Sequence, residues 1–98
     1  MRVTIDSVLV RCKELAAADV DGRAVVLSLD AGSYFDFNRT ATEIWGMLAE
    51  PRSVSEVFYC LSKQHDVDAE TLTHDVTPFL QTLVEQRLVR MVAPEEMR

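Results

Sequence analysis

The chain has few of the residues from which cross-links and metal sites are built. Its 98 residues include two cysteines, two histidines, three glycines and three prolines. Cys12 and Cys60 lie far from each other and from the histidines in the sequence, which excludes a CxxC redox motif and the paired ligand spacing of a structural zinc site. We expect both thiols to stay reduced and to pack as small apolar side chains.

Long apolar runs and a surplus of basic residues are also missing. No stretch reaches the roughly 18 apolar residues of a membrane span, and no basic region followed by an apolar run opens the chain. We therefore expect a cytoplasmic protein with no membrane partner. Sixteen acidic against ten basic residues give a formal net charge of −6, which repels phosphate backbones, so nucleic acid is not the expected partner.

The remaining composition is that of one globular domain. Hydrophobic residues make up 48% of the chain and charged residues 27%, which disfavours disorder. A chain of this length can bury one core but is too short for a two-lobed enzyme with an enclosed cleft. We expect a single domain over residues 1–98.

Three segments near the start of the chain have the composition of strands. Ser7 to Lys13, Ala24 to Leu29 and Tyr34 to Phe37 are rich in β-branched, aliphatic or aromatic residues. Asp21-Gly22 marks a turn between the first two, and the Gly-containing stretch from Asp30 to Ser33 joins the second to the third. The pattern predicts a three-stranded antiparallel meander.

Three helices are predicted after the meander, each with its own start signal. Asn38 or Thr40 can cap the first, Ser53 with Glu56 forms a capping box for the second, and Asp68 caps the third. Apolar residues at helical spacing then give each helix one buried face. These faces comprise Ala41, Ile44, Trp45 and Leu48; Val54, Val57, Phe58 and Leu61; and Leu72, Val76, Phe79, Leu80 and Leu83.

A strand-like segment from Leu88 to Val92 completes the order. The predicted fold is α+β: a winged helix-turn-helix with an N-terminal three-stranded antiparallel sheet followed by three helices. Pro78 falls inside the third helix, where it removes one backbone hydrogen bond and crowds the carbonyl of His74. We expect a bend or a late helix start there.

A winged-helix fold raises the hypothesis of a DNA-binding transcription regulator. Its recognition helix would be Ala69 to Arg87, in which three acidic residues, Glu70, Asp75 and Glu85, outnumber the single arginine. A helix that faces phosphates needs the opposite balance of charge. The charge pattern therefore disfavours this hypothesis.

No set of residues indicates catalysis. Catalysis needs a nucleophile beside a base, paired carboxylates or clustered metal ligands. His65 and His74 are nine residues apart without an evident third ligand, and Asp19 and Asp21 fit the role of turn formers. We predict a protein that is not an enzyme and that holds no metal and no cofactor.

The most distinctive stretch runs from Ser33 to Trp45, where an aromatic strand leads directly into a capped helix. Alternation along a strand places Tyr34 and Asp36 on one side and Phe35 and Phe37 on the other. Aromatic residues on both sides indicate that something covers the second face as well. We expect Phe37 and the single tryptophan in the core, and Tyr34 at a binding groove.

The order of motifs from about Val8 to Val92 resembles the PqqD-like family, the peptide-recognition proteins of lasso-peptide and related pathways. In these pathways a ribosomally made precursor peptide is modified, and the proteins are called RiPP recognition elements. The resemblance rests on Val26-Leu27-Ser28-Leu29-Asp30, Gly32, Tyr34-Phe35-Asp36-Phe37-Asn38, the helix Thr40-Ala41-Thr42-Glu43-Ile44-Trp45-Gly46-Met47-Leu48, and Asp75-Val76-Thr77-Pro78-Phe79-Leu80-Gln81-Thr82-Leu83. Arg87 departs from the family pattern, which usually has Gly before the terminal Leu-Val pair.

The resemblance implies a non-catalytic protein that binds the leader segment of a precursor peptide and delivers it to a modifying enzyme. That enzyme would be a leader peptidase in a lasso-type pathway or a radical SAM enzyme in a cofactor-type pathway. The leader would add as an antiparallel strand beside Tyr34 to Phe37, in a groove shared with the third helix. The implied peptide-binding residues are Tyr34, Phe35, Asp36, Phe37, Leu72, Asp75, Val76 and Phe79.

Two alternatives stay open beside leader recognition. One is the winged-helix regulator of transcription. The other is a structural subunit that forms a homodimer, in which the strand from Tyr34 to Phe37 pairs with its own copy, because an exposed edge strand invites such pairing.

Overall fold

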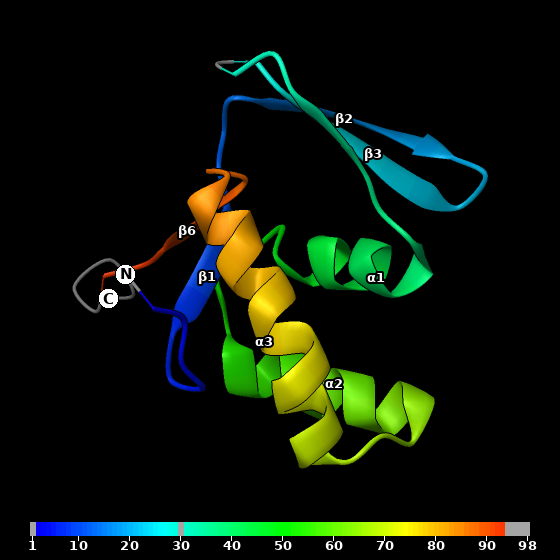
Figure 1. Ribbon diagram of the computed structural model, residues 1–98, viewed down its shortest axis with the longest axis vertical. Coiled ribbons are helices and arrows are strands. Elements are labelled where there is room, and N and C mark those ends of the chain that lie inside the picture. The colour runs from blue at the N-terminus through cyan, green and yellow to red at the C-terminus, as the bar shows by residue number, and fades with distance from the viewer. Residues whose placement is uncertain (1, 30, 94–98) are drawn as a thin grey trace.

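The computed structural model describes residues 2–29 and 31–93, and within them segments far apart in the sequence share one sheet (Figure 1). One sheet has the strand order β5-β1-β6, and the other has the order β2-β3-β4. The elements are β1 (Val8–Arg11), β2 (Leu15–Val20), β3 (Arg23–Ser28), β4 (Tyr34–Asp36), α1 (Arg39–Met47), β5 (Arg52–Ser53), α2 (Val54–His65), α3 (Ala69–Glu85) and β6 (Val89–Met91).

The first sheet joins the beginning of the chain to its end. Its central strand β1 pairs antiparallel with β5 on one side and with β6 on the other. Leu9 of β1 is fully buried, and so are Val89, the first residue of β6, and Leu88 directly before it. The strand-like C-terminal segment predicted from the sequence is therefore confirmed as β6.

The second sheet is built on a tight hairpin between β2 and β3. Asp21 and Gly22 have φ angles of 56° and 81°, the conformation that a two-residue type I′ turn requires. Six residue pairs connect β2 to β3, and β4 then pairs antiparallel with the other side of β3. As a result β2 and β4 are the two edge strands of this sheet.

The predicted meander is wrong in its first strand. The segment from Ser7 to Lys13 does contain β1, but β1 belongs to the other sheet. The neighbour of β3 is instead β2, a strand that the sequence pattern missed. Three of its six residues are alanine, which has a low intrinsic preference for strands, and its pairing depends on the hairpin turn.

The three predicted helices are present, and the structure identifies their caps. The Asn38 side chain accepts a hydrogen bond from the Ala41 amide at 2.8 Å, so Asn38 is the cap of α1 and Thr40 lies in its first turn. The capping box of α2 is formed by Ser53 and Glu56 as predicted. Asp68 caps α3.

The Asp68 cap responds to protonation because its carboxylate is the acceptor. The Thr71 amide donates to Asp68 Oδ1 at 2.8 Å, and this hydrogen bond lowers the pKa of Asp68 below its usual value. The cap is therefore intact at neutral pH, and its contribution is lost as the pH falls through the lowered pKa.

The predicted apolar helix faces meet in one core. Every residue predicted for these faces is buried except Phe79, which is half-buried. The Phe37 and Trp45 rings are also buried, as predicted, and they pack edge to face with centroids 5.7 Å apart. Arg11 of β1 lies over the Trp45 ring. Its guanidinium carbon is 4.6 Å from the ring centroid, and its Nε donates a hydrogen bond to the Trp45 carbonyl.

Helix α3 runs without interruption through Pro78. It starts at Ala69, directly after its Asp68 cap, so the late start predicted from Pro78 is wrong. The Thr82 hydroxyl donates to the Pro78 carbonyl at 3.0 Å, within the next turn. The predicted bend stays a prediction.

The end of α3 adopts a conformation that normally suits glycine. The Leu88 amide donates to the Leu83 carbonyl at 2.9 Å and the Arg87 amide to the Val84 carbonyl at 3.1 Å, which is the hydrogen-bond pattern of a Schellman motif. Arg87, the residue that directly follows the helix cap Gln86, has a φ of 61°. A side chain with a Cβ is disfavoured at such an angle.

We predict that Arg87→Gly stabilises the fold by about 1 kcal/mol, because glycine adopts positive φ without the steric cost of a Cβ. Urea unfolding followed by circular dichroism measures the change. Arg87→Ala is the matched control, since it removes the arginine side chain but keeps the Cβ and hence the strain. Equal free energies of unfolding for the Gly and Ala variants would contradict the explanation.

Candidate functional site

The outer edge of β4 presents unpaired backbone groups. The Phe37 amide donates to the Ala24 carbonyl at 2.9 Å, and the Ser33 carbonyl accepts from the Ser28 amide at 2.8 Å. Because backbone groups alternate in direction along an antiparallel strand, the N–H and C=O groups of Tyr34 and Asp36 point away from β3. The β4 edge thus offers two donors and two acceptors to a further strand.

The side chains of β4 divide between the two faces of the sheet. Phe35 lies opposite Val26, which is fully buried, and it packs against the core. Tyr34 lies opposite Leu27 on the other face, where 72% of its surface is exposed. Asp36 shares this face and forms an ion pair with Arg23 at 3.6 Å. The alternation predicted from the sequence is confirmed.

Helix α3 is held close to the end of β4 by an aromatic contact. The Phe79 ring of α3 packs edge to face on the Phe37 ring, with centroids 5.7 Å apart. Phe37 follows β4 directly, so this contact sets the position of the edge relative to the helix.

Two adjoining cavities follow the N-terminal half of α3, and we call them the α3 cavities. Each has a volume of about 250 Å³, and Thr40, Asp75 and Val76 line both. The cavity nearer β4 is also lined by Asn38, Ala41, Ile44 and Phe79. The other is also lined by Leu61, His65, Val67, Thr71 and Leu72. Their walls come from all three helices and are largely apolar.

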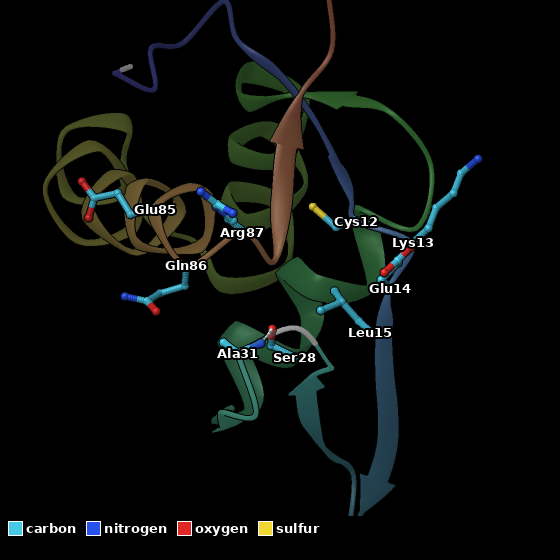
Figure 2. A pocket seen from close by; sticks show the side chains of 9 residues that line it. All are labelled: Cys12, Lys13, Glu14, Leu15, Ser28, Ala31, Glu85, Gln86 and Arg87. Atoms are coloured by element: carbon cyan, nitrogen blue, oxygen red, sulfur yellow. Dashed lines mark hydrogen bonds between the residues drawn. The ribbon is translucent and has the colours of Figure 1, made fainter.

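A third and larger cavity lies at the opposite end of β4, and we call it the C-terminal cavity. Its volume is about 520 Å³. Figure 2 shows the last residues of α3 on one side, with Ser28 and Ala31 and the segment leading into β2 on the others. The complete lining is Cys12, Lys13, Glu14, Leu15, Ser28, Ala31, Glu85, Gln86 and Arg87.

The three cavities define a direction along the β4 edge. Ala31 in the C-terminal cavity precedes β4, and Asn38 in the α3 cavities follows it. Along α3 the order is reversed, because Asp75 lines the α3 cavities and Arg87 lines the C-terminal cavity. Strand β4 and helix α3 therefore run in opposite directions between the same two ends.

Comparison with known proteins identifies the family. The family model of coenzyme PQQ synthesis protein D (PqqD) matches residues 23–89. The chain belongs to the PqqD family. This match includes β3, β4 and all three helices, and it confirms the resemblance seen in the sequence.

A solved structure extends the PqqD-family likeness to the three-dimensional fold. The structure of TbiB1 in complex with the TbiA(beta) leader peptide is similar to this chain with a TM-score of 0.77 and 26% sequence identity. The alignment covers 86% of this chain and 98% of the matched chain. No curated protein matches the sequence.

The eight residues predicted to bind peptide occupy different positions in this PqqD-family fold. Those from α3 (Leu72, Asp75, Val76 and Phe79) line the α3 cavities. Phe37 is buried behind Phe79. Tyr34, Phe35 and Asp36 line neither of these cavities and instead form the strand edge beside them.

Sequence reasoning missed the contribution of α1 and α2 to the cavities. Thr40 lines both α3 cavities from the first turn of α1, and Leu61 and His65 line one from the end of α2. The helical spacing of apolar residues correctly predicted Leu61 in the core. The rim of the α3 cavities forms only when the three helices pack together, so it could not be predicted from one helix. No local motif signals such a rim.

The ionisable groups along the α3 cavities are mostly acidic or paired. Asp75 is exposed, and its carboxylate lies 2.9 Å from His74 Nδ1. His65 Nε2 lies 2.8 Å from Glu43 Oε2. Burial raises the pKa of the Cys12 thiol in the C-terminal cavity, although Arg90 acts in the opposite direction, so a thiol rather than a thiolate is present at neutral pH.

Over residues 2–29 and 31–93, the structure contains no group of three His, Cys, Asp or Glu side chains placed to hold a metal ion. In the same part of the chain, no helix has both the length and the apolar character needed to cross a membrane. The groups that the site does provide are backbone donors and acceptors beside apolar cavities.

The burial of Val76 leads to a stability prediction for this site. Val76 is 6% exposed, so we expect Val76→Asp to lower the free energy of unfolding by about 3 kcal/mol or more, because it buries a carboxylate without a partner. Asp75→Ser, a change at the exposed neighbour, should stay within about 0.5 kcal/mol of wild type. Denaturant unfolding of both variants tests the contrast, and equal stabilities would refute it.

Proposed function

We propose that this PqqD-family protein binds the leader segment of a ribosomally synthesised precursor peptide by strand addition to β4. The single observation that carries the proposal is the β4 edge, where the backbone groups of Tyr34 and Asp36 face outward beside apolar cavities. The similarity to TbiB1, whose solved structure contains a leader peptide, supports the same ligand class here. PqqD-like recognition elements are generally non-catalytic peptide-binding proteins.

In strand addition, main-chain contacts provide affinity and side-chain contacts provide sequence specificity. Hydrogen bonds to the edge bind any extended peptide, whereas pockets for alternate side chains select its sequence. The α3 cavities, at about 250 Å³ each, fall below the roughly 300–1,000 Å³ of typical small-molecule pockets. They fit single apolar side chains of a peptide, with Asp75 at the rim for a basic neighbour.

The direction of the added strand follows from its surroundings. Every strand pair described in both sheets is antiparallel, so we assign the same direction to the leader. Its N-terminal part then lies at the α3 cavities, and its C-terminal part leaves the edge at the C-terminal cavity. Side chains on its outer face would lie beside Tyr34, and those on its inner face beside Phe35.

Delivery to a partner enzyme is the second part of the proposal. The bound leader would be presented to a modifying enzyme, a leader peptidase or a radical SAM enzyme, in the cytoplasm. The helices and the β5-β1-β6 sheet would serve as a winged helix-turn-helix framework for peptide rather than for DNA. Glu70, Asp75 and Glu85 are exposed on α3, and they would repel a phosphate backbone.

The test of strand addition is Asp36→Pro compared with Asp36→Ala. Both variants lose the ion pair to Arg23, but only proline removes the amide that faces the open edge, and the bonds to β3 remain. We expect Asp36→Pro to bind about 5- to 10-fold more weakly than Asp36→Ala, since one main-chain hydrogen bond contributes about 1 kcal/mol. Fluorescence anisotropy measures the dissociation constants.

The labelled probes are the leader segments of short precursor genes beside the gene of this chain, with the TbiA(beta) leader as a second ligand. Circular dichroism establishes that both variants are folded. Equal binding by the Pro and Ala variants would refute strand addition to β4, and a wild-type protein that binds none of these leaders would refute leader recognition.

A further inference from the structure

Arg87 has a disfavoured backbone conformation, and no polar contact of its side chain within the described residues offsets the steric cost. Among residues 2–29 and 31–93, three residues other than glycine have positive φ angles, and the two besides Arg87 are Asp21 and Asp66. The short aspartate side chain tolerates this region because it bonds to the nearby backbone. Arginine has no such compensation, and the Arg87 side chain makes no hydrogen bond or ion pair with residues 2–29 or 31–93.

The position of Arg87 connects it to the β4 edge. Its side chain lines the C-terminal cavity and also an adjoining cavity of about 370 Å³ beside Val84, Val89 and Met91. Figure 2 shows Arg87 across the C-terminal cavity from Ser28, the last residue of β3, and from Ala31, which precedes β4. The apolar stem of the arginine thus has a packing surface, and Arg87 shares the C-terminal cavity with Ala31, at the end of β4 where an antiparallel leader would leave the edge.

The other charged groups of the C-terminal cavity are Lys13, Glu14 and Glu85. Glu85 accepts a hydrogen bond from Gln81 one turn earlier in α3, at 3.4 Å, and in Figure 2 its carboxylate is directed away from Ser28 and Ala31. Glu14 lies on the far wall beside Lys13. Arg87 is therefore the basic residue that lines this cavity from the end of α3, whereas Lys13 lines it from the segment before β2.

We propose that Arg87 is a specificity residue, which binds an Asp or Glu side chain of the leader just after the segment paired with β4. The inference rests on the proposed function. A guanidinium binds a carboxylate through two parallel hydrogen bonds, which favours Arg over other donors at such a position. The binding of this carboxylate would account for an arginine where glycine is more stable.

The length of α3 predicts the spacing between the apolar and the acidic residue of the leader. Val76 lies on α3, and Arg87 follows the Gln86 cap of this helix eleven residues later, which corresponds to about 16 Å at about 1.5 Å per residue of helix. An extended peptide covers this length with about five residues at about 3.3 Å each. The acidic residue should therefore follow the apolar residue of the α3 cavities by about five positions.

Selection from a random peptide library tests this inference, because the library itself supplies candidate leader sequences. Fifteen-residue peptides in mRNA display would be selected on the wild type, Arg87→Gly, Arg87→Lys, Arg87→Glu and Asp21→Gly. We expect the wild type to enrich Asp or Glu about five positions after a shared apolar residue. Arg87→Lys should keep a weaker preference, because lysine keeps the charge without the two parallel hydrogen bonds. Arg87→Gly should lose the preference, and Arg87→Glu should enrich Lys or Arg.

A selected peptide then gives the size of the effect. Replacing its acidic residue by the matching amide should weaken binding to the wild type about two- to five-fold, as for an exposed charge pair. The same replacement should leave binding to Arg87→Gly unchanged. Asp21→Gly places glycine at another position of positive φ, in the β2–β3 turn and outside the lining of the cavity, so its selected sequences should equal those of the wild type.

The outcomes separate this inference from the proposed function. If Arg87→Gly enriches the same acidic position as the wild type, the role of Arg87 is refuted while leader binding stands. If the wild type enriches no peptides over the edge-blocked Asp36→Pro variant, leader binding by β4 fails and the role of Arg87 fails with it.

Discussion

The Phe37 ring sets the position of β4 relative to both helices that border it. One edge-to-face contact joins it to Trp45 of α1, and a second joins it to Phe79 of α3. Its amide bonds to Ala24 of β3 at the same time. Because one residue contacts strand, sheet and helices, it places the β4 edge beside the α3 cavities, and the proposed binding of a peptide to both would benefit from this preorganisation.

An exposed edge is ordinarily a liability, because it invites pairing with other chains. Strand β4 limits this risk through its length of three residues, which leaves only two residues with outward backbone groups. Specific binding then requires the neighbouring cavities as well as the edge. In the proposed binding mode, a ligand combines an extended backbone with apolar side chains at the right spacing, which favours a defined peptide over general aggregation.

Local signals in the sequence predicted the helices well. Asn38, Ser53 and Asp68 proved to be the caps, because capping depends on residues only three positions away. The buried helix faces followed from periodicity for the same reason. Pairing of β1 with β6 was not predictable in this way, since it joins residues about 80 positions apart and no local pattern encodes such a partner. The alanine-rich β2 escaped detection because its strand depends on β3.

The sequence by itself determined the family, the starts of the helices and the alternation of Tyr34 and Asp36 with Phe35 and Phe37. All of these rest on order, spacing and the two-residue period of a strand. Only the tertiary structure decided which edge of β4 is open, that Thr40 shares the rim of the cavities with Asp75, and that Arg87 lies across from Ala31. These arrangements depend on how separate helices and strands pack. Packing brings together residues that are far apart in the sequence and that no local pattern relates to each other.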